Sequence, residues 1–230
     1  AKLISNKVVC NSFSESQRLK KQFFLSNKVN TIWNGYQIKK IDSVSFKNKK
    51  SKKQLLVVGR ISYPKNGINL MKALMLFYKN NGWIPTIKWA GRRDFDNQSS
   101  KTFNEMNDFL SQNPKLKNSW IWLGEVKNLN ILYNESDALI LPSLWEGLPN
   151  VICEAMLLGC NVIASNVCDN YKLLGNGNHG ILFEPKSINS ICQSIEKFYL
   201  LSEEEKIKMA KTARKFAMSN LDLKKMVRSY

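Results

Sequence analysis

A short apolar run that ends at a proline is the feature of this sequence that most constrains its fold. Residues Ala138 to Leu141 are apolar without interruption, and Pro142 then stops the run. Such a run is typical of a strand buried on both faces, as the strands of parallel sheets are. The apolar spacing beyond Pro149 predicts a helix over 149–158, with Gly159 as its C-terminal cap.

Strand and helix patterns alternate along most of the chain. This alternation predicts an α/β fold with a Rossmann-like, doubly wound parallel sheet. Further strands are expected at 55–58, 86–90, 120–123, 161–164 and 181–183. Further helices are expected at 66–78, 101–111, 128–135, 188–200, 203–217 and 221–230. Asn66 and Ser202 are the side chains expected to cap two of these helices.

The first fifty residues have a different organisation. Strands are expected at 8–10 and 29–32, and Ser12 or Ser14 can cap a helix that runs between them to about Leu25. This βαβ-like unit cannot close a core by itself, because its two strands keep open edges. A lysine-rich run over 47–53 without apolar residues is typical of a solvated linker, and a basic arm that binds phosphates is the alternative.

Two glutamates near the helix over 149–158 can face one pocket. Glu146 lies in the loop before the helix and Glu154 about one turn inside it. Between them, Gly147 and Leu148 present backbone N–H groups where the helix begins. Such an end has unsatisfied donors and partial positive charge, which suits a diphosphate.

Two cations follow the first strand of the large unit. Gly59 and Arg60 stand at the carboxyl end of strand 55–58, and Lys65 follows in the same loop. Sheets of this class bind their ligands at the carboxyl ends of their strands. Arg60 and Lys65 would therefore neutralise a diphosphate from the side opposite the helix end.

Residues 142–159 read Pro-Ser-x-x-Glu-Gly-x-Pro-x-x-x-x-Glu-Ala-x-x-x-Gly, with seven residues between the two glutamates. This pattern resembles the signature of retaining glycosyltransferases of family 4 (group 1). The resemblance implies a GT-B enzyme, of which most of this chain is the C-terminal, donor-binding half. The implied reaction transfers a sugar from a nucleoside diphosphate sugar to an acceptor with retention of configuration, and it requires no metal or other cofactor.

The resemblance also implies a role for each matching position. Glu146 would contact hydroxyls of the donor sugar, Glu154 would hold the ribose, and Arg60 and Lys65 would stabilise the leaving diphosphate. The remaining candidate donor contacts are Gly59, Gly124, Val126, Gly147, Leu148, Pro149 and Asn150. The loop at Gly124 and Val126 would read the base through main-chain groups, so uridine, guanosine and adenosine donors all stay open.

Two loops depart from the family pattern. Gly91-Arg92-Arg93-Asp94 replaces a Gly-x-Gly-Pro turn, and Cys168-Asp169-Asn170-Tyr171-Lys172 replaces Gly-Gly-x-x-Glu. No contact is therefore carried over to Lys172, which stands where the family has an acid.

The resemblance extends to the division of the chain into domains. Residues 1–45 are expected to be a remnant of an N-terminal acceptor domain, 46–54 a basic linker, and 55–230 the nucleotide-sugar-binding domain. The last helix, over about 221–230, is expected to pack back on the N-terminal part. The acceptor would be a glycan or a lipid-linked acceptor, in cell-surface polysaccharide or lipopolysaccharide synthesis.

The chain is strongly basic, with 35 Lys and Arg against 18 Asp and Glu and a net charge of +17. An anionic membrane surface, nucleic acid, or a merely lysine-rich composition could account for the charge. We do not expect nucleic acid, because the basic residues are scattered and the aromatics have core-like spacing. We expect a cytoplasmic protein without a membrane helix, with peripheral contact to the inner face of the membrane as one interpretation.

Cysteine and histidine usage narrows the chemistry. The five cysteines are odd in number and form no Cys-x-x-Cys pair, so we expect reduced thiols and no zinc site. His179 is the single histidine, and we expect an exposed turn residue.

The main alternative is a non-catalytic basic Rossmann-like module that binds nucleotides or polyanions. An epimerase or a phosphorylase of the same architecture is less well matched, since the cleft offers one histidine and no cofactor-lysine motif. The sequence leaves the sugar and the oligomeric state open.

Overall fold

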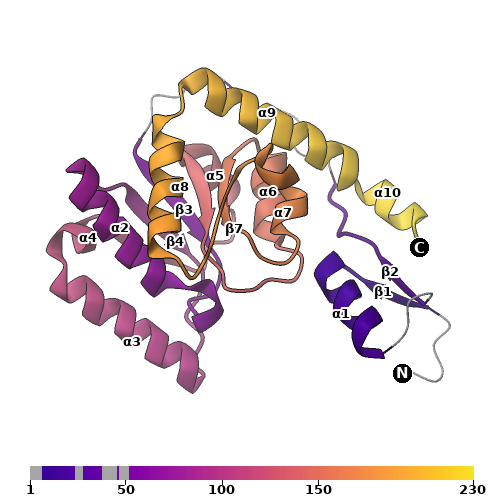
Figure 1. The fold of residues 1–230 in the computed structure, drawn as a ribbon, viewed down its shortest axis with the longest axis horizontal. Helices are drawn as coiled ribbons and strands as arrows, with labels where there is room; N and C mark the ends of the chain where they lie inside the picture. The colour runs from indigo at the N-terminus through magenta and orange to yellow at the C-terminus, as the bar shows by residue number, and fades with distance from the viewer. Residues whose placement is uncertain (1–6, 24–27, 38–45, 47–51) are drawn as a thin grey trace.

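The computed structural model describes residues 7–23, 28–37, 46 and 52–230. Its centre is a six-stranded sheet in the order β5-β4-β3-β6-β7-β8, in which every neighbouring pair is parallel. The strands are β3 (Gln54–Val58), β4 (Thr86–Ala90), β5 (Trp120–Gly124), β6 (Ala138–Leu141), β7 (Asn161–Ser165) and β8 (Ile181–Phe183). The predicted doubly wound α/β fold is therefore confirmed (Figure 1).

Helices cover both faces of the sheet. Their bounds are α2 (Gly67–Asn81), α3 (Asn97–Gln112), α4 (Pro114–Asn118), α5 (Asn130–Glu135), α6 (Asn150–Leu157), α7 (Asn170–Leu173), α8 (Ile188–Leu200), α9 (Glu203–Asn220) and α10 (Leu223–Arg228). Short 3-10 turns, η2 (Tyr63–Lys65) and η3 (Gly175–Gly177), lie between them.

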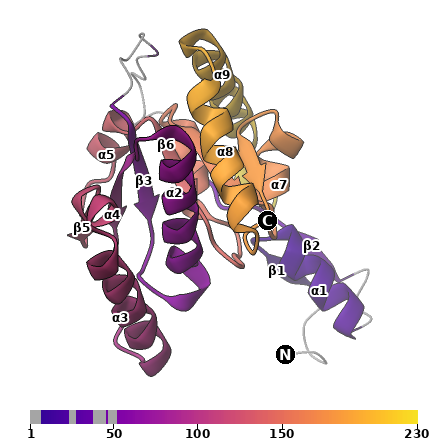
Figure 2. The ribbon, with the colours of Figure 1, turned by 60° about the vertical axis from the view of Figure 1, so that its left-hand side comes forward.

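The alternation of side chains along β3 explains the two layers. Leu55 and Val57 point into a core shared with α2, α3, α4 and α8, and in Figures 1 and 2 α2 and α8 lie side by side. Leu56 and Val58 point into the opposite core, shared with α5, α6, α7 and α9. Because both faces are buried, β3 is apolar at successive positions, as in other parallel sheets.

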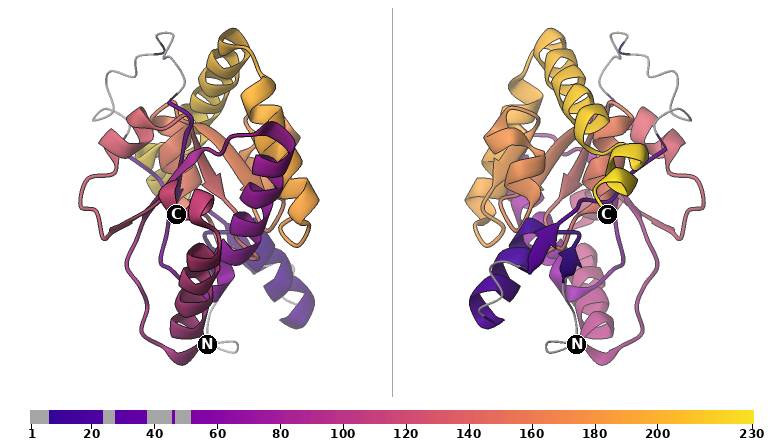
Figure 3. Two further views of the ribbon diagram at one scale, coloured as in Figure 1. Left: turned by 90° about the vertical axis from the view of Figure 1, so that its left-hand side faces the viewer. Right: turned by 90° about the vertical axis from the view of Figure 1, so that its right-hand side faces the viewer.

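The N-terminal residues form a small unit of their own. Strands β1 (Val8–Cys10) and β2 (Val29–Thr31) pair in parallel, and α1 (Phe13–Phe23) connects them. Figures 1 and 3 show this unit beside α10, at the end to which α9 leads. An isolated parallel β-bridge between Tyr36 and Asp222 joins the segment after β2 to the residue before α10.

Helix α10 contacts the segment that follows β2. A Cβ on Gly35 would lie 2.6 Å from Leu223 Cα, and Gly35 N donates to Met226 Sδ at 3.1 Å. Leu223 and Met226 are thus partly covered, whereas Val227 and Tyr230 are 60% and 78% exposed.

Several predicted boundaries are wrong by a few residues. Helix α3 begins at Asn97 instead of 101, because Asp96 accepts a hydrogen bond from Ser99 N and caps it there. Helix α5 begins at Asn130, two residues after its predicted start, and α9 ends at Asn220 instead of 217. Helices α4 and α7 were not predicted. Strand β3 takes Gln54 from the expected linker, of which 47–51 lie outside the described residues.

Capping predictions had mixed outcomes. Ser202 caps α9, as predicted, and forms a reciprocal capping box with Glu205. Ser12 Oγ accepts a hydrogen bond from Glu15 N at the start of α1. Asn66 precedes α2 with a left-handed φ of 56° but is not a side-chain cap, and its side-chain amide donates to Pro142 O and Pro185 O instead. Pro149 precedes α6 instead of opening it.

The five cysteines are free in the structure. His179 is half-buried instead of exposed, since its ring packs 4.7 Å from that of Phe216 and its Nδ1 lies 3.2 Å from Leu173 O.

Candidate functional site

The loops after four adjacent strands are joined by backbone hydrogen bonds at the carboxyl edge of the sheet. Gly59 N donates to Ala90 O at 2.9 Å and Gly91 N donates to Gly124 O at 2.7 Å, which joins the ends of β3, β4 and β5. Leu144 N donates to Pro64 O at 2.8 Å and joins the loops after β6 and β3. Ligands of open parallel sheets bind at this edge.

One glycine at this edge is sterically required. A Cβ at Gly91 would lie 1.9 Å from the carbonyl oxygen of Gly59, which is far inside contact distance. The first position of the Gly91-Arg92-Arg93-Asp94 loop is therefore fixed by the close approach of two backbones.

Lys65 and Glu146 are brought together. Lys65 Nζ donates to Glu146 Oε1, and Ser143 Oγ donates to the same oxygen at 2.6 Å. The two charged side chains are 18% and 14% exposed. The lysine stem passes over Gly59, where a Cβ would lie 2.9 Å from Lys65 Cε. The pair is thus a compact, partly desolvated charge pair at the sheet edge.

Arg60 is not part of that pair. Its Nη1 donates to Asp94 Oδ2 at 2.7 Å, and Arg92 Nε lies 3.6 Å from Asp94 Oδ1. Both arginine side chains are 63% exposed, so one carboxylate holds two solvent-accessible guanidinium groups. Because both guanidinium groups are accessible to solvent, an anionic ligand could bind either of them directly.

The residues that follow Glu146 differ in what they can offer. Gly147 is exposed and has no heavy atom within 4 Å of an added Cβ, whereas Leu148 and Pro149 are buried. Asn150, the first residue of α6, accepts hydrogen bonds at Oδ1 from Tyr36 Oη at 2.8 Å and Asn34 Nδ2 at 2.9 Å. The side chains of Leu148 and Pro149 therefore hold the loop, and only their main chain remains for a ligand.

Glu154 lies on α6 and is half-buried. Tyr133 Oη, on α5, donates to Glu154 Oε2 at 3.1 Å. Burial raises the pKa of Glu154 above its usual value, and the hydrogen bond from Tyr133 opposes this shift. Burial also raises the pKa of Tyr133, so its hydroxyl remains a donor. Glu154 is a preoriented acceptor for paired hydroxyl groups.

The predicted base loop lies beside these groups. Gly124, at φ 66°, is exposed, and its carbonyl is taken by Gly91 N. Val126 packs against the core that lies under α6. The exposed main chain at Gly124 is what this loop offers a ligand.

Sequence reasoning missed several partners of the site. In the sequence, Ser143 belongs to the signature, Tyr133 lies in the expected helix over 128–135, and Asp94 lies in a loop that departs from the family pattern. Asn66 Nδ2 donates to Pro142 O at 3.0 Å and Pro185 O at 2.8 Å, which joins the loops after β3, β6 and β8. In the sequence Asn66 indicates only a helix cap, and nothing there indicates its two carbonyl partners.

Lys172 does not reach the charge pair. Its Nζ lies 3.5 Å from the ring centroid of Phe13. Among the residues that the structure describes, no group of three or more potential metal ligands comes together. None of the helices within the described part combines the length and apolar character of a membrane span.

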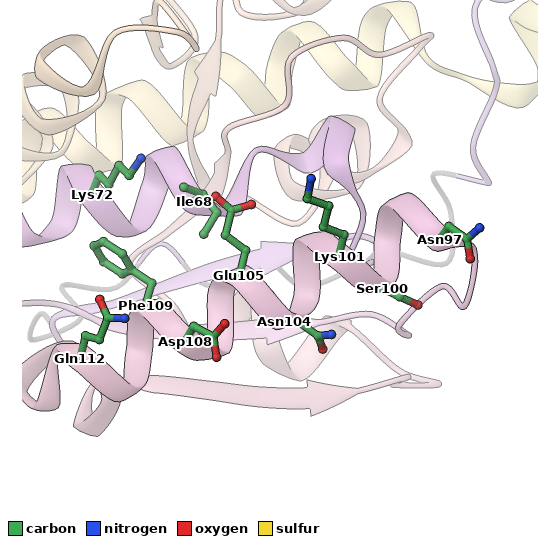
Figure 4. Close-up of a pocket in the computed structure, with 10 residues that line it drawn as sticks. All are labelled: Ile68, Lys72, Asn97, Ser100, Lys101, Asn104, Glu105, Asp108, Phe109 and Gln112. Carbon is green, nitrogen blue, oxygen red and sulfur yellow. The ribbon is translucent and has the colours of Figure 1, made fainter.

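A groove of about 730 Å³ between α2 and α3 is separate from the predicted site residues. In Figure 4, Lys101 and Glu105 of α3 point toward α2, whereas Asn104 and Asp108 point away from it. Its mixed charges do not indicate one class of ligand.

The chain is similar in sequence to proteins that are named as glycosyltransferases. Two curated relatives are a UDP-Gal:alpha-D-GlcNAc-diphosphoundecaprenol alpha-1,3-galactosyltransferase of Escherichia coli and the capsular polysaccharide biosynthesis glycosyltransferase CapH of Staphylococcus aureus. The first is 30% identical over 60% of this chain and 34% of its own length. The second is 28% identical over 74% of this chain and 46% of its own length. The chain thus spans less than half the length of either relative.

Solved structures share the fold. The structure of Alr3699/HepE of Anabaena with UDP-glucose matches all of this chain and 63% of its own with a TM-score of 0.85 at 20% identity. A glycosyltransferase of Rickettsia africae ESF-5 matches 97% of this chain and 61% of its own with a TM-score of 0.83 at 21% identity. The family model described as "Glycosyl transferases group 1" matches residues 37–216. The chain belongs to the group 1 glycosyltransferases.

Proposed function

We propose that this chain binds a nucleoside diphosphate sugar and forms the donor half of a retaining glycosyltransferase of family 4. The observation that carries the proposal is the meeting of Lys65 and Glu146 at the carboxyl edge of the sheet, with Glu154 on the adjacent helix. A cation, an acceptor for sugar hydroxyls and an acceptor for ribose hydroxyls are the three groups that such a donor needs.

Each residue has a definite task in this proposal. Lys65 and Arg60 bind the diphosphate and stabilise the charge that develops as it leaves. The diphosphate carries less negative charge in the bound donor than in the transition state. Fixed cations there therefore stabilise the transition state more than the bound donor and lower the barrier. Glu146 accepts from sugar hydroxyls, and Glu154 accepts from the ribose.

Main-chain groups complete the donor site. Gly147 and Leu148 present N–H groups to the phosphates and sugar beside the first residue of α6, and Gly59 lets the lysine stem pass close to the backbone. Gly124 and Val126 hold the base through main-chain groups. Retention is proposed to proceed by attack on the same face that the diphosphate leaves, with no protein carboxylate as nucleophile.

Residues 1–45 are proposed to be the end of an acceptor domain. The contacts between α10 and the segment around Gly35 support an arrangement in which the chain crosses back to that unit. The 230 residues of this chain alone are then expected to bind donor without efficient transfer. The relatives' names support a glycan or lipid-linked acceptor, as in capsular or lipid-linked polysaccharide synthesis.

Calorimetric titration tests the proposal. UDP, GDP, ADP and their sugar conjugates are titrated into the chain and into Glu154→Ala and Arg60→Ala, at low and moderate salt. Saturable one-to-one binding of one nucleotide, weakened about tenfold or more in both variants, is expected. Arg18→Ala is the matched control, because Arg18 forms an ion pair of 2.6 Å with Glu15 and is 62% exposed, closely similar to Arg60.

The net charge of +17 favours one competing function, a non-catalytic module that binds polyanions. Such a module would lose only one charge's share of affinity in Arg60→Ala, and Arg18→Ala would weaken it equally. Equal losses in the two variants would refute the donor site. Association with vesicles of anionic lipid, measured by sedimentation, separately tests the proposed peripheral contact with the inner face of the membrane.

A further inference from the structure

Asp169 is a fully buried carboxylate that receives four hydrogen bonds from the N-terminal unit. Its relative exposure is 0%, and it lies in the loop between β7 and α7. Its Oδ2 accepts from Phe13 N at 2.7 Å and from Trp33 Nε1 at 3.0 Å. Its Oδ1 accepts from Ser14 N at 2.8 Å and from Ser12 Oγ at 3.2 Å.

These contacts satisfy the start of α1. The first amides of a helix have no partner within the helix, and a negative charge there is favourable. Asp169 accepts from two of these amides, and Ser12 Oγ accepts from a third, Glu15 N, at 3.3 Å. Within the described part of the chain no ion pair reaches Asp169. The four hydrogen-bond donors, two of them amides of the helix start, therefore compensate its charge.

Aromatic packing surrounds the same contact. The rings of Phe13 and Trp33 meet edge to face at 5.5 Å, and Trp33 meets Phe216 of α9 at 6.3 Å. The N-terminal unit is thus held against the large domain by a charged bond inside an apolar setting, where hydrogen bonds are strengthened.

The residue before Asp169 touches the candidate donor site. Cys168 has a φ of 50°, and its Sγ accepts a hydrogen bond from Glu146 N at 3.5 Å. The loop that carries Asp169 therefore supports the backbone of Glu146 on one side and the start of α1 on the other. Asp169 stands where the family pattern has glycine, which has no side chain that could accept from α1.

We propose that Asp169 is a positioning residue that couples the docking of α1 to the sugar-contacting loop at Glu146. The inference rests on the proposed donor site. With α1 bound to the carboxylate, the loop over 166–169 is fixed and Cys168 supports Glu146 in the position that faces the donor sugar. The diphosphate and ribose contacts come from Lys65, Arg60 and Glu154, and of these only Lys65 meets this loop, indirectly, through its ion pair with Glu146.

The test compares donors with and without a sugar. Asp169→Asn keeps the shape of the side chain and removes its charge, so that at most one oxygen still accepts from α1. Affinities for UDP-glucose, GDP-mannose, ADP-glucose and the matching nucleoside diphosphates are measured by calorimetry. For the nucleotide that the wild-type chain binds, we expect the sugar conjugate to lose about tenfold in affinity and the bare diphosphate less than about twofold.

Hydrogen exchange supplies the second readout. In Asp169→Asn the amides of Phe13 and Ser14 should exchange faster, with no ligand present. Asp137→Asn is the matched control, because Asp137 also joins distant segments, accepting from Lys52 N at 3.0 Å and Gln54 N at 2.9 Å at the amino end of β6. This variant should lower the melting temperature without changing the ratio of the two affinities.

The outcomes separate the claims. Faster exchange at α1 with an unchanged ratio of affinities would overturn the positioning role and leave Asp169 with only a structural role in docking α1. Unchanged exchange would overturn that structural role as well. A wild-type chain that binds none of the three donors would refute the proposed function and the positioning role with it, while exchange at Phe13 and Ser14 would still test whether Asp169 docks α1.

Discussion

The ammonium group of Lys65 donates a hydrogen bond to the carboxylate of Glu146 and so joins the loop after β3 to the loop after β6. The two predicted site residues of opposite charge thus neutralise each other before a ligand is present. In the proposed donor site, a diphosphate would compete with Glu146 for the lysine and would release the carboxylate toward the sugar. The proposal thus links donor binding to the orientation of Glu146 through this one bond.

Lys65→Met should weaken both binding and stability. The affinity for a nucleoside diphosphate, measured by calorimetry, should fall about tenfold, because one charge-assisted contact is lost. The free energy of unfolding should fall by about 1–3 kcal/mol, because the partly buried carboxylate of Glu146 loses its cation. Lys72→Met, on the exposed face of α2, is the control and should change neither quantity. Undiminished affinity in Lys65→Met would contradict the assignment of the lysine.

Asp94→Asn should strengthen donor binding. Asp94 holds Arg60 and Arg92, and a diphosphate must compete with it for their guanidinium groups. An exposed ion pair contributes about 0.2–1 kcal/mol, so its removal should raise affinity up to about fivefold. The gain should shrink at moderate salt because screening already weakens the pair. Glu15→Gln, which releases Arg18, should leave affinity unchanged, and weaker binding by Asp94→Asn would contradict the competition.

Much of the fold was predictable because its signals are local. Strands β6 and β8 match their predicted bounds, since a buried parallel strand is a short apolar run between turn residues. The start of α3 was missed because residues 97–100 are polar and show no apolar period. Helix α4 was missed because five residues are too few to show an apolar period.

The site was predictable only as a set of residues. The signature named both glutamates, and the structure places Glu146 against Lys65. The partners of Arg60 and Asn66 depend on how loops 34 and 76 residues apart meet. No periodicity encodes that meeting, and an arginine on a carboxylate reads the same in sequence as a free one. The roles assigned to these residues in donor binding stay predictions.

Glu154→Gln should separate stability from binding. Burial raises the pKa of Glu154 in the folded chain, so the stability that its neutral form contributes is present below the unfolded pKa and is lost as pH rises through the folded pKa. The variant carries no such charge. Its melting temperature should match that of the wild type near about pH 4 and exceed it at neutral pH. Its affinity for nucleotide should be about tenfold weaker, since a charged acceptor is gone.

The same shift should make the proposed donor binding sensitive to acid. Protonation of Glu154 removes acceptor capacity for the ribose. The affinity of the wild-type chain should therefore fall on acidification, at a pH above the pKa of an ordinary glutamate. Tyr133→Phe removes the hydrogen bond that holds this pKa down, and it should move the fall to a higher pH. A pH profile of calorimetric affinity checks both. An identical profile in Tyr133→Phe would contradict the role of the tyrosine.

Asn66→Ala should be the most destabilising of these changes. The buried Nδ2 group donates to Pro142 O and Pro185 O, and the residue adopts a left-handed φ of 56°, which asparagine tolerates better than alanine. Two buried carbonyl oxygens lose their donor, so the free energy of unfolding should fall by about 2–4 kcal/mol. Asn69→Ala is the control, because Asn69 Nδ2 reaches the same Pro185 O only at 3.5 Å. Asn66→Gly should recover the part of the loss that arises from backbone strain and none of the part from hydrogen bonding. Chemical denaturation of the four proteins measures this, and equal losses in Asn66→Ala and Asn69→Ala would show that Asn66 does not join the three loops.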